Sequence, residues 1–147
     1  IYDFKNINKI YDRYKFVILQ CPFSIFDQRL SHKNTIYKLK KNNVEIHVRS
    51  IFLQGLLLKN KIDNRFLKWN KEFQNYSNWL KKNNIDKIQA SLNFVINHDF
   101  VNKIVIGFDS QNQINDLLNK LDNYNYLKFP NYLKINDLKL INPSNWK

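Results

Sequence analysis

The sequence predicts an α/β fold built around a parallel sheet. Short apolar runs rich in β-branched residues alternate along the chain with longer segments in which apolar residues recur at helical spacing. The short runs are apolar almost throughout, as is typical of strands in a sheet that is covered on both faces. At 147 residues, the chain has the length of one domain with a single hydrophobic core.

The first half of the chain alternates helix and strand. Apolar residues over 7–14 recur at helical spacing and predict the first helix, and the continuous apolar run over 16–19 predicts the first strand. A second helix is expected around 36–39. The alternating, β-branched pattern over 44–48 then predicts the second strand.

The second half continues this order with two helices, a strand and a helix. Helical spacing over 69–80 and over 88–96 predicts two consecutive helices, and the β-rich run over 104–106 predicts the third strand. The spacing over 114–121 predicts a last helix. The tail, 129–147, contains two prolines and little periodicity, so we expect it to be irregular; residues 1–147 are predicted to form one partial domain without an internal boundary.

The charge of the chain is strongly positive but dispersed. The formal net charge is +12, with 20 lysines against 4 arginines and 24 asparagines scattered along the chain. Because the basic residues form no single stripe, we interpret them as solvated surface and not as a nucleic-acid site, although a basic nucleic-acid-binding protein is kept as an alternative. No apolar run approaches the roughly 20 residues of a membrane span. A single cysteine, Cys21, fits a reducing compartment, so a cytoplasmic location is expected.

Three segments of the chain resemble the aldo/keto reductase family in its bacterial branch. The segment 20–30 has a glutamine followed by the pattern Pro-aromatic-x-x-x-Asp-x-Arg, and 44–57 has a strand followed by Ser-x-x-x-x-Gly-x-Leu. The segment 104–114 resembles the last strand of the family's barrel and the loop that follows it. These segments stand in the family's order, and they imply the C-terminal half of a TIM barrel, about strands 6 to 8 with their helices.

The resemblance implies a site for a nicotinamide cofactor at the ends of the strands. It assigns Gln20 to the nicotinamide carboxamide and the loop that begins at Ser50 to the pyrophosphate. It places an adenosine 2′-phosphate at the start of the last helix. The implied cofactor-binding residues are Gln20, Ser50, Phe52, Gln54, Gly55, Gly107, Asp109, Ser110 and Gln113.

Each of these assignments has a structural alternative. Gln20 is also suited to capping the sheet against a neighbouring loop, and Gly55 is equally suited to a plain turn. Asp109 or Ser110 is also a suitable N-cap for the helix that follows. These alternatives stay open at the level of the sequence.

Several residues depart from the family's pattern. Arg49 stands where many members have an aromatic ring that stacks on the nicotinamide, so Phe23 or Phe52 is the candidate substitute. Ser110 matches a position that is often arginine, and Leu117 one that is often asparagine. NADP is the family's usual cofactor, but these departures leave the choice between NADP and NAD open.

The chain has no segment that resembles the family's catalytic tyrosine, lysine, aspartate and histidine, which come from the first half of the barrel. We therefore assign no catalytic residue, and because the sequence opens at Ile1 and contains no methionine, we interpret Ile1 as a cut. For the full-length protein, the resemblance implies reduction of a small carbonyl substrate by NADPH or NADH; a non-catalytic nicotinamide-binding or regulatory module is the alternative. The three histidines and Cys21 lack the spacing of a metal site, so none is expected.

Overall fold

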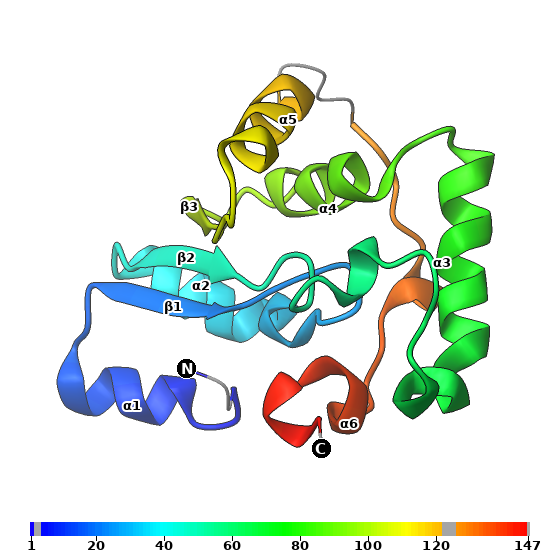
Figure 1. Cartoon of the computed structure of the whole chain (residues 1–147). Coiled ribbons are helices and arrows are strands. Elements are labelled where there is room, and N and C mark those ends of the chain that lie inside the picture. The colour runs from blue at the N-terminus through cyan, green and yellow to red at the C-terminus, as the bar shows by residue number, and fades with distance from the viewer. Residues whose placement is uncertain (2–3, 122–125, 147) are drawn as a thin grey trace.

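The computed structural model describes residues 1, 4–121 and 126–146 and shows helices packed around a small sheet (Figure 1). The helices are α1 (Ile7–Tyr14), α2 (Lys33–Lys41), α3 (Asn70–Lys82), α4 (Lys87–Ile96), α5 (Gln111–Leu121) and α6 (Leu138–Ile141). The strands are β1 (Ile18–Pro22), β2 (Glu45–Arg49) and β3 (Lys103–Val105). The predicted alternation of helix and strand is confirmed in its order.

The sheet is parallel, with the strands in the order β1-β2-β3. Its register places Gln20 beside His47, and His47 beside Lys103. The first strand begins two residues later than the apolar run over 16–19 predicts. The reason is that Phe16 packs its ring against Tyr11 of α1, with centroids 5.4 Å apart, so its apolar character reflects contact with a helix and not strand pairing.

The two faces of the sheet differ in burial. Leu19, Cys21, Ile46 and Val48 are buried against the helices. The other face, which we call the open face, carries residues that alternate with these along the strands. Its members are Ile18, Gln20, Glu45, His47, Arg49, Lys103 and Val105. The expectation that both faces are covered therefore holds for only one face within the part of the chain that the structure describes.

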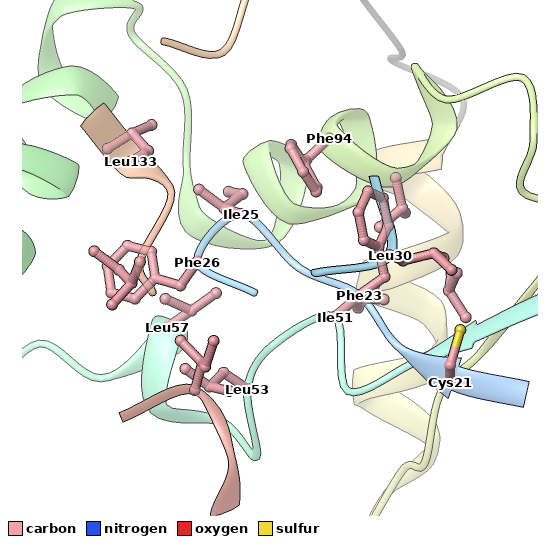
Figure 2. Packing of buried hydrophobic residues seen from close by; sticks show 14 of the residues in the cluster. Cys21, Phe23, Ile25, Phe26, Leu30, Ile51, Leu53, Leu57, Phe94 and Leu133 are labelled. Carbon is pink, nitrogen blue, oxygen red and sulfur yellow. The ribbon is translucent and has the colours of Figure 1, made fainter. Parts of the chain in front are cut away.

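The hydrophobic core joins the strand ends to α3, α4 and the C-terminal segment. Figure 2 shows Phe23, Phe26 and Phe94 within it, together with Leu53 and Leu57 from the segment after β2. All five side chains are almost fully buried. The loops that follow β1 and β2 are thus anchored by apolar side chains, which holds their backbones in place at the carboxyl end of the sheet.

The C-terminal segment is less irregular than predicted. It contains the short helix α6 and contributes Leu133, Ile135 and Leu140 to the core. The backbone N–H of Ile135 donates to the carbonyl oxygen of Phe26 at 2.9 Å, which ties this segment to the loop after β1. Among the described residues, we find no helix with the length and apolar character that crossing a membrane requires.

Candidate functional site

A groove of about 850 Å³ opens at the carboxyl ends of β2 and β3. One wall is the segment after β2, up to the 3-10 helix η2 (Leu56–Leu58), and the other is the segment after β3 together with α5. In a parallel α/β sheet, this edge is where loops from neighbouring strands meet and where ligands bind. The lining residues are 49–52, 54–55, 58, 88, 105–109, 113 and 116–117.

Nine residues were assigned to cofactor binding on the basis of the sequence. Seven of them line this groove, although they come from separate parts of the chain. They are Ser50, Phe52, Gln54, Gly55, Gly107, Asp109 and Gln113. Gln20 and Ser110 are not among the lining residues. The structure therefore brings together the predicted loops after β2 and β3, whereas Gln20 lies elsewhere.

The loop after β2 has an unusual backbone. Ser50, Leu53 and Gln54 have positive φ angles of 58°, 49° and 54°, and Gly55 has a φ angle of 77°. Left-handed backbone costs an ordinary L residue roughly 1–2 kcal/mol. Three successive residues, Leu53 to Gly55, hold this conformation, and the buried Leu53 side chain anchors them in the core. Strain that the surrounding packing maintains in this way is concentrated at binding sites.

This conformation leaves hydrogen-bond donors available at the groove. Within the described part of the chain, the backbone N–H groups of Phe52, Gln54 and Gly55 have no hydrogen-bond partner, whereas Leu53 and Leu56 donate within the turn. Successive backbone N–H groups in turns form concave sites that bind anions. A Cβ added at Gly55 would meet no atom within 4 Å, so the space beside this backbone is open.

The opposite wall begins with the N-terminus of α5. The Gln113 N–H donates to the Ser110 hydroxyl at 3.4 Å, and the Asp109 N–H donates to the side-chain oxygen of Gln113 at 3.0 Å. Ser110 therefore caps the helix, which is the structural alternative that the sequence left open. The carboxylates of this wall belong to Asp109 and Asp116, and Gly107 again has no atom within 4 Å of a Cβ position.

Gln20 lies on the open face, two residues before the end of β1. Its neighbour in the register is His47, whose Nε2 lies 2.7 Å from Glu45 Oε2. Lys103 Nζ is 3.6 Å from the same carboxylate, and the pKa of Glu45 is lowered, first by its bond to His47 and then by Lys103. Gln20 thus belongs to a row of polar residues that crosses the sheet with His47 and Lys103, and it is not part of the groove lining.

The aromatic substitutes differ in their access to the groove. Phe23 is completely buried in the core, whereas Phe52 is partly buried and lines the groove. Arg49 also lines it, with one guanidinium nitrogen 3.2 Å from the Ser50 hydroxyl oxygen. Of the two ring candidates, the structure brings only Phe52 to this site.

Two features of the groove were missed at the level of the sequence. The left-handed backbone at Ser50, Leu53 and Gln54 has no compositional signal, because none of these residue types favours positive φ. Asp116 has a signal that is visible in hindsight: it lies three residues after Gln113 and therefore on the same helix face.

Comparisons with known proteins agree with this architecture. The family model described as aldo/keto reductase family matches residues 2–128. No curated protein matches the sequence significantly. Among solved structures, the apo form of the aldo-keto reductase AKR11C1 from Bacillus halodurans is similar with a TM-score of 0.67 and 20% identity over 87% of this chain. Its holo form gives a TM-score of 0.68 and 19% identity over 90% of this chain.

These matches also define how much of the fold is present. The chain spans about half the length of the solved structures, 46% of the apo chain and 47% of the holo chain. The parallel sheet and its helices accordingly correspond to part of a TIM barrel, as predicted. Since the family model matches more than half of the residues of this chain, the chain belongs to the aldo/keto reductase family.

Proposed function

We propose that the groove binds the dinucleotide part of a nicotinamide cofactor, NADP or NAD, and that the full-length protein reduces a small carbonyl substrate. The observation that carries this proposal is the loop 50–55, in which groove-lining residues in the described part of the chain have backbone N–H groups without a hydrogen-bond partner. Aldo/keto reductases as a family use nicotinamide cofactors, and one similar structure is a holo form.

The residues of the groove fit the chemistry of a dinucleotide. The N–H groups of Gln54 and Gly55, with the Ser50 hydroxyl, would hold the pyrophosphate oxygens, because phosphate is best bound by donors that need no reorganisation. Ile51 and Leu117 supply buried apolar surface in the walls. A groove of about 850 Å³ is within the usual range for cofactor sites, roughly 300–1,000 Å³.

The sheet end of the groove suits the nicotinamide. Phe52 lines the groove and offers a ring face for the nicotinamide, whereas Gln20, on the open face of the sheet, lies outside the lining. When bound, the cofactor would supply the hydride for carbonyl reduction. This chain's own residues would orient the ring and hold the phosphates, and we propose that the proton donor lies elsewhere in the full-length protein.

A blocking substitution tests the site. Gly107 has no positive φ angle and has open space at its Cβ position, so Gly107→Val should fold normally and place a branched side chain beside the groove. We expect the dissociation constant of the full-length protein for NADPH and for NADH, measured by calorimetry, to rise at least tenfold.

The matched control is Asp99→Val. It introduces the same side chain at an exposed residue that pairs with Lys40 at 2.8 Å and does not line the groove. Dinucleotide affinity should be unchanged in this variant. A Gly107→Val protein that binds the dinucleotides as tightly as the wild type would rule out this groove as the cofactor site.

A further inference from the structure

The charges in the groove bear on which dinucleotide it selects. Among the described lining residues, Arg49 is the only cation, and it lies at the strand end of the groove. The two carboxylates, Asp109 and Asp116, both lie on the wall that contains α5. The groove is therefore positive toward the sheet and negative toward the helix.

The place of the reacting ring orients a bound dinucleotide. If the groove is the cofactor site, as proposed above, the nicotinamide must lie at the sheet end, since the reacting ring has to reach the active-site mouth at the carboxyl ends of the strands. The pyrophosphate then lies against the loop 50–55, and the adenosine lies against the α5 wall. The ribose that differs between NAD and NADP is thus closest to Asp109 and Asp116.

The start of α5 combines backbone donors that are only partly used with a carboxylate beside them. A helix N-terminus attracts anions through its unbonded N–H groups and its partial positive charge. Here, the N–H groups of Asp109 and Gln113 already donate to side chains, and the Asp109 carboxylate adds a full negative charge beside them. A 2′-phosphate carries about −1.5 to −2 charges at neutral pH, so it would be repelled.

Two lysines lie close to the lining residues, but protein oxygens hold both of them. Lys120 Nζ is 2.6 Å from Asp86 and 3.8 Å from Asp116, so carboxylates balance its charge. Lys87 Nζ bonds to the carbonyl oxygen of Lys59 at 2.6 Å and to Asn60 Oδ1 at 2.8 Å. These bonds direct both ammonium groups toward the protein.

We infer that this groove selects NAD over NADP, with Asp109 and Asp116 as the residues that determine the choice. An acidic side chain near the ribose accepts a hydrogen bond from a 2′-hydroxyl and repels a 2′-phosphate, which is the logic by which dinucleotide-binding proteins separate the two cofactors. The inference rests on the proposed function and adds a cofactor preference to it.

The test compares the affinities of the full-length protein for NADH and NADPH by titration calorimetry. We expect NADH to bind at least tenfold more tightly. The double substitution Asp109→Ser with Asp116→Asn should bring the two dissociation constants to within about threefold of each other, mainly by tightening NADPH. Both residues are on the surface, so the variant should fold.

The control variant is Asp99→Asn, which removes an exposed negative charge away from the groove and should leave the ratio unchanged. Equal or tighter binding of NADPH by the wild type would overturn the inference, as would an unchanged ratio in the double variant. If neither dinucleotide bound at millimolar concentration, the proposed function itself would fail, and the cofactor preference would fail with it.

Discussion

Two residues in the loop after β2, Leu53 and Gln54, have a strained backbone at positions that shape the groove. Leu53 and Gln54 hold positive φ angles that glycine would adopt at lower cost, yet only one glycine, Gly55, is present in this turn. Leu53 compensates by burying its side chain completely. Gln54 is exposed and lines the groove, so its strained backbone is not balanced by core packing. Such a residue is expected where binding is maintained at the expense of stability.

The substitution Gln54→Gly tests this trade-off. Relief of the left-handed strain should raise the free energy of unfolding by about 0.5–1 kcal/mol, as measured by urea denaturation. The substitution keeps the backbone N–H but removes a side chain that lines the groove, so dinucleotide binding should weaken several-fold.

Asn84→Gly is the matched control, because Asn84 has a φ angle of 48° in the turn between α3 and α4, outside the groove. It should be stabilising or neutral and leave binding unchanged. If Gln54→Gly lowered stability, the assignment of strain to this residue would be wrong.

At the scale of elements, the end of α4 is joined to the loop after β1 by a cluster of rings. His98 lies with its ring centroid 4.8 Å from Phe94, 4.9 Å from Phe23 and 5.1 Å from Phe100. Its Nδ1 is 2.7 Å from the carbonyl oxygen of Phe94. Burial lowers the pKa of His98, against the smaller opposing effects of that carbonyl and of Asp99. The cluster is thus built around a neutral imidazole.

This arrangement predicts a pH dependence of stability. Because the folded state holds His98 with a pKa below its ordinary value of 6.5, the unfolded state binds more protons as the pH falls below that value. The free energy of unfolding should therefore be highest above pH 6.5 and should decline as the pH falls toward the folded-state pKa.

Urea denaturation between pH 7.5 and pH 5 provides the measurement. His98→Phe should flatten the decline, since phenylalanine keeps an aromatic ring in the cluster and does not titrate. His32→Asn, which removes an exposed histidine, is the control and should not flatten it. An equal decline in the His98→Phe protein would show that other groups are responsible.

At the scale of the whole molecule, the C-terminal segment connects elements that are distant in sequence. Asp137 accepts a hydrogen bond from the indole N–H of Trp69 at 3.1 Å, and Trp146 packs its ring 4.9 Å from Phe66. In Figure 1, this segment passes from the α3 side of the molecule to the region below the sheet. The segment therefore contributes to the stability of the core despite its low helix content.

Two leucines of α6 test that role. Leu140 is fully buried, so Leu140→Ala should lower the free energy of unfolding by about 2–4 kcal/mol through lost burial and a residual cavity. Leu138 lies in the same helix with 48% exposure, and Leu138→Ala should cost less than about 1 kcal/mol. Equal effects in urea denaturation would mean that α6 does not pack in the core as described.

Much of the architecture could be predicted because burial leaves a local pattern. The helical spacing over 69–80 arises from the core-facing side of α3, and the alternation over 44–48 arises from the two faces of β2. Parallel pairing followed from the alternation of strand and helix, since parallel strands require a crossover. The groove could be predicted in part, because the carboxyl ends of parallel strands meet at one edge of the sheet. The sequence had already assigned Gly55 and Gly107, which follow two of these strands, to cofactor binding.

The remainder depended on interactions between distant residues. The left-handed backbone of Leu53 and Gln54 depends on how the buried Leu53 side chain anchors the loop. The position of Gln20 on the sheet, beside His47, depends on the register between β1 and β2. The sequence left open whether Ser110 binds the cofactor or caps α5, and the hydrogen bond from the Gln113 N–H to the Ser110 hydroxyl identifies it as a cap. The four-residue helix α6 is too short to leave a periodic signal.

The amino-acid sequence by itself determined the α/β class, the order of elements, the family and most of the residues that meet in the groove, because these depend on residue type and spacing along the chain. Tertiary structure alone decided which backbone N–H groups are unbonded, which face of the sheet is open and where the carboxylates of α5 lie relative to the loop after β2. Those properties depend on packing between segments that are far apart in sequence, and no local pattern encodes such packing.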